Sequence, residues 1–243
     1  MKGVSNIGAI MYSSEDLGYM IKGLISYEVG GQTLWITTTH VSQLIITIVL
    51  IIVAFAVRNR MKKAEEVPGT FQCLCEAVVE MLDNMVITNM GARGRKYCNY
   101  IITLFIFILV SNIGGVFGLR SPTADYGVTL MLALVTFVLI HYNGIRHQKL
   151  EYWKGYLDPF PVFLPVNIIS EFATPVSLSL RLFANMVSGT LIMALWYGLM
   201  PLLFKLGLPA ALHVYFDLFS GAIQTYVFCM LTMIFVSQRF PEE

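Results

Sequence analysis

A single arginine lies deep inside a long apolar stretch of the sequence. Arg181 falls within residues 160–197, far from both ends of the stretch. A guanidinium at the depth of a bilayer costs about 2.5–3.5 kcal/mol on insertion scales, and here it lies too deep to reach the interface. A structural explanation would be an ion pair inside the chain. We favour a functional charge that acts on a passing ion, because the surrounding sequence is patterned with polar residues.

Polar residues recur at helical spacing on both sides of Arg181. They are Asn167, Ser170, Glu171, Thr174 and Ser177 before it, and Asn185 and Ser188 after it. Steps of three and four residues place them all on one face of a helix. Small residues of this kind also permit close helix packing, but packing does not explain a charge.

A second polar stripe follows in the last apolar stretch. It consists of His213, Asp217, Ser220 and Gln224, which recur at steps of three and four residues. Asp217 alone could be a partner of His213 or Arg181, whereas its place in a stripe favours an acid in an ion path. His213, near the start of the helix, is expected at the membrane interface.

Two antiparallel helices with these stripes would form two polar routes that meet at a fixed charge. One route is expected to contain Asp217, Asn185, Ser188 and Thr190, and the other Asn167, Glu171 and Thr174. Arg181 and Gln224 are expected to meet between them and to repel a cation there. The cation must then transfer to a carrier, for which a carboxylate on a partner is the obvious candidate. Both H⁺ and Na⁺ fit such a path.

The elements that position these stripes are membrane-spanning helices. Of the 243 residues, 56% are hydrophobic and 13% are charged, and the mean hydropathy is +0.69, too apolar for a soluble domain. The predicted fold is an all-α integral membrane protein with residues 1–33 as an external segment and residues 34–243 as the membrane domain. Five spans are expected at about residues 36–58, 97–119, 125–145, 162–199 and 206–237.

A further segment, at about residues 70–90, is amphipathic and is expected to lie at the interface. In that case 11 basic residues fall on one side of the membrane and 4 on the other, whereas a spanning segment gives 9 and 6. The positive-inside rule therefore favours five spans, an external N-terminus and a cytoplasmic C-terminus. A short external helix is also expected over Tyr12 to Tyr27. The four cysteines lack metal-ligand spacing, and no cofactor is expected.

The sequence around Arg181 resembles the signature helix of subunit a of the rotary F-type ATP synthases. The match runs from Pro175 to Gly189, which reads PVSLSLRLFANMVSG. Further matches are Phe71, Gln72, Glu76, Asn112, Pro122 to Asp125, and Asp217 with Gln224. The resemblance covers about residues 35–237.

This resemblance implies roles for individual residues. Arg181 is similar to the essential stator arginine and Gln224 to its partner on the last helix. Asp217 resembles the acid or histidine of an external half-channel, with Asn185 and Asp125 near its entrance.

Two positions depart from the family pattern. Asn167 stands where many relatives carry an acid, and Glu171 on the same face is expected to replace it. Thr190 stands where some bacterial relatives carry a glutamate, which would make Asp217 the main acid of the outer path.

The resemblance also implies a function and partners. The chain would carry H⁺, or Na⁺, through two offset half-channels and couple the ion gradient to rotation and ATP synthesis, with no catalytic site of its own. Its partners would be the c-subunit ring and the b subunits of the peripheral stalk, in a bacterial plasma membrane and without nucleic acid. The last two spans would form a long tilted hairpin along the ring.

Two other functions fit the sequence less well. The alternative is an ion-coupled secondary transporter, but the sequence has no second copy of the arginine segment, and paired repeats are common in such carriers. An intramembrane hydrolase is disfavoured because there is no His-Glu-x-x-His motif and no convincing nucleophile with a base.

Overall fold

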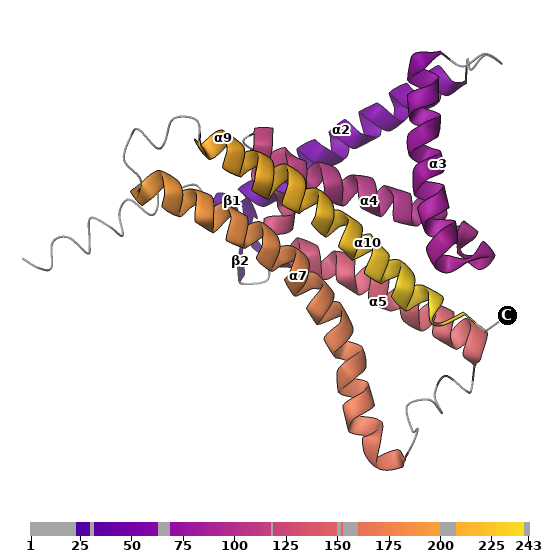
Figure 1. The fold of residues 1–243 in the computed structure, drawn as a ribbon. Coiled ribbons are helices and arrows are strands. Elements are labelled where there is room, and N and C mark those ends of the chain that lie inside the picture. The colour runs from indigo at the N-terminus through magenta and orange to yellow at the C-terminus, as the bar shows by residue number, and fades with distance from the viewer. Residues whose placement is uncertain are drawn as a thin grey trace, which may run out of the picture.

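The computed structural model describes residues 23–29, 32–62, 69–117, 119–149, 152, 160–199 and 208–240. Among these residues, five helical segments are long and apolar enough to cross a membrane. They are α2 (Thr38–Met61), α4 (Cys98–Ile113) with the flanking 3-10 turns η1 (Ala92–Tyr97) and η2 (Gly114–Phe117), α5 (Tyr126–Gln148), α7 (Leu164–Leu199), and the run of α9 (Leu208–His213), η5 (Val214–Ser220) and α10 (Gly221–Ser237). The predicted helical membrane domain with five spans is confirmed (Figure 1).

Helix α3 (Thr70–Met90) runs across the ends of α4 and α10 (Figure 1). It buries Leu82, Val86 and Met90, and it is not among the described helices that are apolar enough to span. Its location at a membrane interface stays a prediction.

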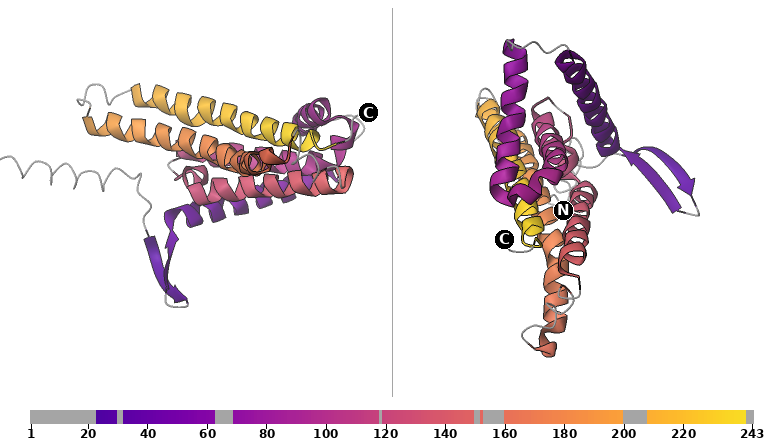
Figure 2. Two further views of the ribbon diagram at one scale, coloured as in Figure 1. Left: turned by 90° about the horizontal axis from the view of Figure 1, so that it is seen from below. Right: turned by 90° about the vertical axis from the view of Figure 1, so that its right-hand side faces the viewer.

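A β-hairpin precedes the first span. Strands β1 (Gly23–Val29) and β2 (Gln32–Thr37) pair antiparallel, with Val29 opposite Gln32, and β2 leads directly into α2 (Figure 2). The helix expected over Tyr12 to Tyr27 is therefore wrong from residue 23 onward, and residues 12–22 lie outside the described part. The physical reason is local composition, since both strands are rich in β-branched and aromatic residues, which favour strands over helices.

The hydrophobic core lies among α3, α4, α5, α7 and α10. Val86, Ile108, Ala133, Leu182 and Phe228 come from these five helices and are at most 1% exposed. Much of the remaining apolar surface is exposed, as on α2, where Ile52 is 61% exposed. An apolar exterior of this kind suits a lipid environment.

Helix α7 and the α9–α10 run lie side by side as a long hairpin (Figures 1 and 2). The 36 residues of α7 correspond to about 54 Å of helix at 1.5 Å per residue. Pro175 lies inside α7, where it cannot donate to the carbonyl of Glu171, four residues earlier. The N-terminal part of α7 bends away from α10 (Figure 1), as an interior proline favours.

Candidate functional site

Arg181 lies on an exposed face of α7. It makes no hydrogen bond or ion pair with any residue that the structure describes. The ion pair within the chain that would have explained the charge structurally is therefore not found in the described residues. The guanidinium is available to a charged group outside the chain.

One cavity opens next to this arginine, between α7 and α10, and we call it the Arg181 cavity. Its lining residues on α7 are Ser170, Ala173, Thr174, Ser177, Leu178 and Arg181, and those on α10 are Leu231 and Phe235. Its volume of about 290 Å³ accommodates several water molecules, since one occupies about 30 Å³ in the liquid. The predicted polar stripe on the N-terminal side of Arg181 thus lines a common space, with Ser170, Thr174 and Ser177 as its polar members.

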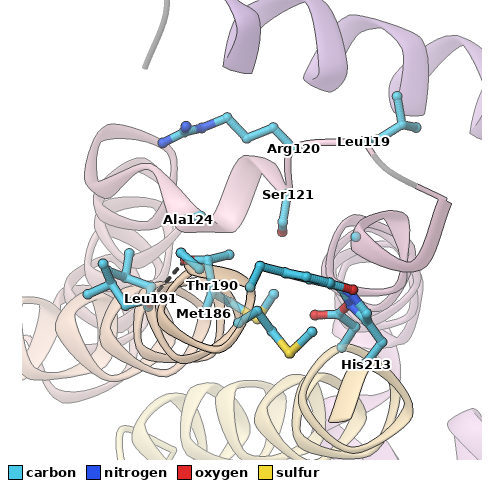
Figure 3. Close-up of a pocket in the computed structure, with 14 residues that line it drawn as sticks. Leu119, Arg120, Ser121, Ala124, Met186, Thr190, Leu191 and His213 are labelled. Atoms are coloured by element: carbon cyan, nitrogen blue, oxygen red, sulfur yellow. Dashed lines mark hydrogen bonds and ion pairs between the residues drawn. The ribbon is translucent and has the colours of Figure 1, made fainter. Parts of the chain in front are cut away.

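A second cavity, the Asp217 cavity, lies toward the other end of the hairpin (Figure 3). It has a volume of about 330 Å³ and is enclosed by the segment after η2, by the C-terminal half of α7 and by the α9–η5 region. Its polar lining residues are Arg120, Ser121, Thr190, Tyr197, His213 and Asp217. Arg181 does not line this cavity, and the two cavities have no lining residue in common.

Asp217 and His213 form a close pair within the Asp217 cavity. Nδ1 of His213 lies 2.7 Å from Oδ2 of Asp217, and the hydroxyl of Tyr197 lies 3.4 Å from Nε2 of the same ring. The side chain of Asp217 is 12% exposed, whereas that of His213 is 37% exposed. Spacing of four residues therefore brings these two site residues together, as expected, with His213 on the more open side.

The turn that carries Asp217 is a π-helix, η5, which the sequence analysis did not predict. Turns of this kind are rare in proteins as a whole, and those that occur often lie at functional sites. Because a π turn has more residues than an α turn, the α-helical spacing assumed for His213 to Gln224 does not hold through Val214–Ser220. The π turn changes the angular spacing of the stripe in this segment, although His213 and Asp217 remain paired, and the stripe as an ion path stays a prediction.

Asn185 on α7 faces the end of this π turn. Its Nδ2 donates to Oγ of Ser220 at 3.1 Å, and the Ser220 hydroxyl donates back to Oδ1 at 3.2 Å. Ser188 donates to the carbonyl of Asn185 and is exposed, while Thr190 donates to the carbonyl of Val187 and lines the Asp217 cavity. Asn185 thus joins the two long helices between the two cavities.

Gln224 is buried at 8% exposure, and its Nε2 has no hydrogen-bond partner among the described residues. No hydrogen bond joins it to Arg181 within that part of the chain. The expected meeting of the two side chains between the two routes stays a prediction. A buried amide without a partner is costly, which is consistent with a group that acts on a charge or on water.

A buried hydrogen-bond network beside Gln224 was missed as a site by sequence reasoning. Nδ2 of Asn112 on α4 donates to the carbonyl of Gly221 at 3.0 Å and to Oγ1 of Thr225 at 3.2 Å, and its Oδ1 accepts from Thr123 at 2.6 Å. Thr123 continues to Ser121, which lines the Asp217 cavity. The available signal was the same as for Arg181, a strongly polar residue inside an apolar span.

Glu171 does not line the Arg181 cavity. Its Oε1 accepts from Nη2 of Arg239 at 2.7 Å and lies 3.9 Å from Nε2 of His141. Glu171 therefore stands beside the polar stripe and pairs with a residue that follows the last span, a contact that sequence reasoning missed. Asn167, in the first turns of α7, is half-buried.

Asp125 does not line the Asp217 cavity. It caps the N-terminus of α5 by accepting from the backbone N–H of Gly127 at 3.0 Å, and it lines a different cavity together with His40 and Gln43 of α2. Arg120, five residues earlier, does line the Asp217 cavity. Burial lowers the pKa of this guanidinium, and the negative charge of Asp125 opposes that effect.

Comparison with known proteins decides the family. The family model described as "ATP synthase A chain" matches residues 40–237, which include both cavities and Arg181. The chain belongs to the ATP synthase subunit a family. The family that the sequence around Arg181 resembles is thereby confirmed as the family of this chain.

Several curated relatives match over most of their length. "ATP synthase subunit a, sodium ion specific" of Propionigenium modestum is 38% identical over 83% of this chain and 73% of the relative. "ATP synthase subunit a" of Sulfurihydrogenibium sp. is 37% identical over 78% of this chain and 91% of the relative. "ATP synthase subunit a" of Bacillus subtilis is 34% identical over 82% of this chain and 91% of the relative. As a member of the ATP synthase subunit a family, the chain is a multi-pass membrane component of a hetero-oligomeric complex and serves ion transport and ATP synthesis.

Proposed function

We propose that the chain translocates ions through two half-channels that meet at Arg181 and exchange their cargo with carboxylates on a ring of c subunits. The observation that carries this proposal is the exposed Arg181, which has no partner in the described chain and lines only one of two polar cavities. A cation in either cavity meets a fixed positive charge before it reaches the other one. Crossing then requires a carrier outside the chain.

The Asp217 cavity is the proposed outer half-channel. An ion enters past His213 and Asp217, passes Thr190 and Ser188, and reaches the ring near Asn185. Asp217 supplies the acidic group and Gln224 a polar group beside the transfer point. Ser121 gives the wall of this route a polar group, which is hydrogen-bonded through Thr123 to the buried Asn112. Asp125, which lines another cavity, contributes to the surrounding fold.

The Arg181 cavity is the proposed inner half-channel. An ion that the ring delivers is displaced by Arg181 and leaves past Ser177, Thr174 and Ser170. Asn167 lies further along α7 in the same direction, and Glu171 directly follows Ser170; both are placed at the proposed cytoplasmic exit.

The exposed surface of α7 around Arg181 supports a carrier on an apolar partner. Val176, Leu180 and Leu191 lie on the side of α7 next to the polar stripe that carries Arg181 and are 42–45% exposed, so an exposed apolar surface borders the arginine. Such a face suits apolar helices of a partner that buries one carboxylate opposite the guanidinium. A ring of c subunits offers one carboxylate after another as it turns.

The proposed orientation follows the positive-inside rule, with the N-terminus outside and the C-terminus in the cytoplasm of a bacterial cell. In this orientation α3 lies along the cytoplasmic interface, the hairpin of α7 and α9–α10 is tilted along the ring, and b subunits of the peripheral stalk hold the chain against rotation. The proposed cargo is H⁺, with Na⁺ as the alternative, since one relative is named as sodium ion specific.

The proposal is tested with Arg181→Ala in the assembled ATP synthase in inverted membrane vesicles. ATP-driven acidification should be abolished, because ions are no longer displaced from the ring. Acidification at the wild-type rate would reject the proposed role of Arg181.

A further inference from the structure

The ion pair between Glu171 and Arg239 connects the two walls of the Arg181 cavity. Glu171 directly follows Ser170, which lines the cavity on α7, and Arg239 lies four residues after Phe235, which lines it on the α10 side. The Oε1–Nη2 distance is 2.7 Å, and the side chains are 19% and 27% exposed. The pair is therefore largely shielded from solvent, where screening is weaker than at an open surface.

The Arg239 guanidinium is fixed by more than its carboxylate partner. It lies 5.3 Å from the ring centroid of Tyr152, which is itself only 3% exposed. The next residue, Phe240, stacks on Tyr97 at 6.2 Å and contacts His147 at 5.7 Å. The chain after α10 is thus anchored against η1 and α5, so Arg239 offers Glu171 a stationary partner.

The part of α7 that carries Glu171 is the part that needs such a partner. Pro175 interrupts the backbone hydrogen bond to the Glu171 carbonyl, and the helix bends away from α10 before it (Figure 1). Residues Val166, Ile169 and Phe172 on this part are 57–68% exposed. Phe172 on this part packs against Phe137 of α5, and Glu171 pairs with Arg239 and lies 3.9 Å from Nε2 of His141 on α5.

We propose that Arg239 is a positioning residue that holds the bent half of α7 against the end of α10 and so sets the width of the Arg181 cavity. The ion pair acts as a clamp across the cavity wall, and it does not itself bind the transported ion. The inference rests on the proposed function in one respect, namely that the Arg181 cavity is the ion exit. Loss of the clamp lets α7 move outward, widens the cavity and slows coupled transport.

The test measures the separation of the two helices that line the cavity, in the assembled complex. Spin labels are placed at Ile169→Cys on α7 and Tyr226→Cys on α10, both exposed, after the four native cysteines are replaced by alanine. With Arg239→Gln, the distance distribution should broaden and shift to longer distances by about 2 Å or more, the scale of helix movements in switching proteins. The reversed pair, Glu171→Arg with Arg239→Glu, should restore the original distribution.

Arg146→Gln is the matched control. Arg146 lies in the last turn of α5 and also contacts a tyrosine, Tyr142, but among the described residues it has no ion pair across the cavity. It should leave the distance unchanged. Should Arg239→Gln not assemble, Glu171→Gln breaks the same pair from the other side and should give the same shift.

Two results would overturn the proposal. One is an unchanged distance distribution after loss of either partner. The other is a reversed pair that behaves like Arg239→Gln, since the stacking of the guanidinium on Tyr152 would then be the relevant contact. Neither result bears on Arg181, so the clamp can be rejected while the proposed translocation stands.

Discussion

Asn185 and Ser220 exchange two hydrogen bonds, of 3.1 and 3.2 Å, between α7 and the last residue of the π-helical turn η5. This contact joins the two long helices between the two cavities. It also fixes the end of the turn that carries Asp217. The position of the acid in the cavity therefore depends on a helix other than its own.

The first prediction concerns the strength of this contact. Asn185→Ala and Ser220→Ala should each destabilise the chain, and a double-mutant cycle should give a coupling energy of about 0.6 kcal/mol, the average for hydrogen bonds between membrane helices. The measurement is reversible unfolding in mixed detergent micelles. A coupling energy of zero would show that the two side chains do not act as a pair.

A second prediction concerns the close approach of α4 and α10. A Cβ at Gly221 would lie 2.9 Å from Cβ of Asn112, so Gly221→Ala should force the helices apart and weaken the hydrogen bonds of Asn112. We expect a loss of about 1–3 kcal/mol in the free energy of unfolding, as for other overpacked cores. Gly198→Ala is the control, because nothing lies within 4 Å of a Cβ there. Equal stability of the two variants would contradict the packing argument.

A third prediction concerns the acid of the Asp217 cavity. Asp217→Asn should slow ATP-driven ion transport by about tenfold or more. For comparison, the loss of a positioned acid or base in chemical catalysis costs at least about 100-fold in rate. The assay is the rate of acidification in inverted vesicles. Asp125→Asn serves as the comparison, because it keeps the α5 cap and lies in another cavity. Unchanged flux in the Asp217 variant would remove this residue from the path.

The sequence predicts the helical framework well because spanning helices are set by length and apolarity alone. Each of the five expected spans corresponds to a helix, and Ser170, Thr174 and Ser177 share a cavity with Arg181 as their spacing predicts. In a single regular helix, residue count fixes which side chains share a face.

The details that were missed depend on contacts between elements. The π turn around Asp217 has no signature in the sequence, and the pairing of Glu171 with Arg239 joins residues 68 positions apart. The place of Asp125 in a separate cavity depends on where α2 packs against α4 and η3. Periodicity along one helix cannot supply these relationships, because they are set by how the helices pack together.

The central claim is that Arg181 prevents ions from passing directly between the two cavities, so that they cross only when the ring turns. The most direct measurement is passive ion conductance of the membrane sector with its ring locked to the stator by a cross-link. With wild-type Arg181 the locked sector should conduct no ions, whereas Arg181→Ala should conduct them although the ring cannot turn. Equal blockage of both sectors would contradict the barrier role of Arg181.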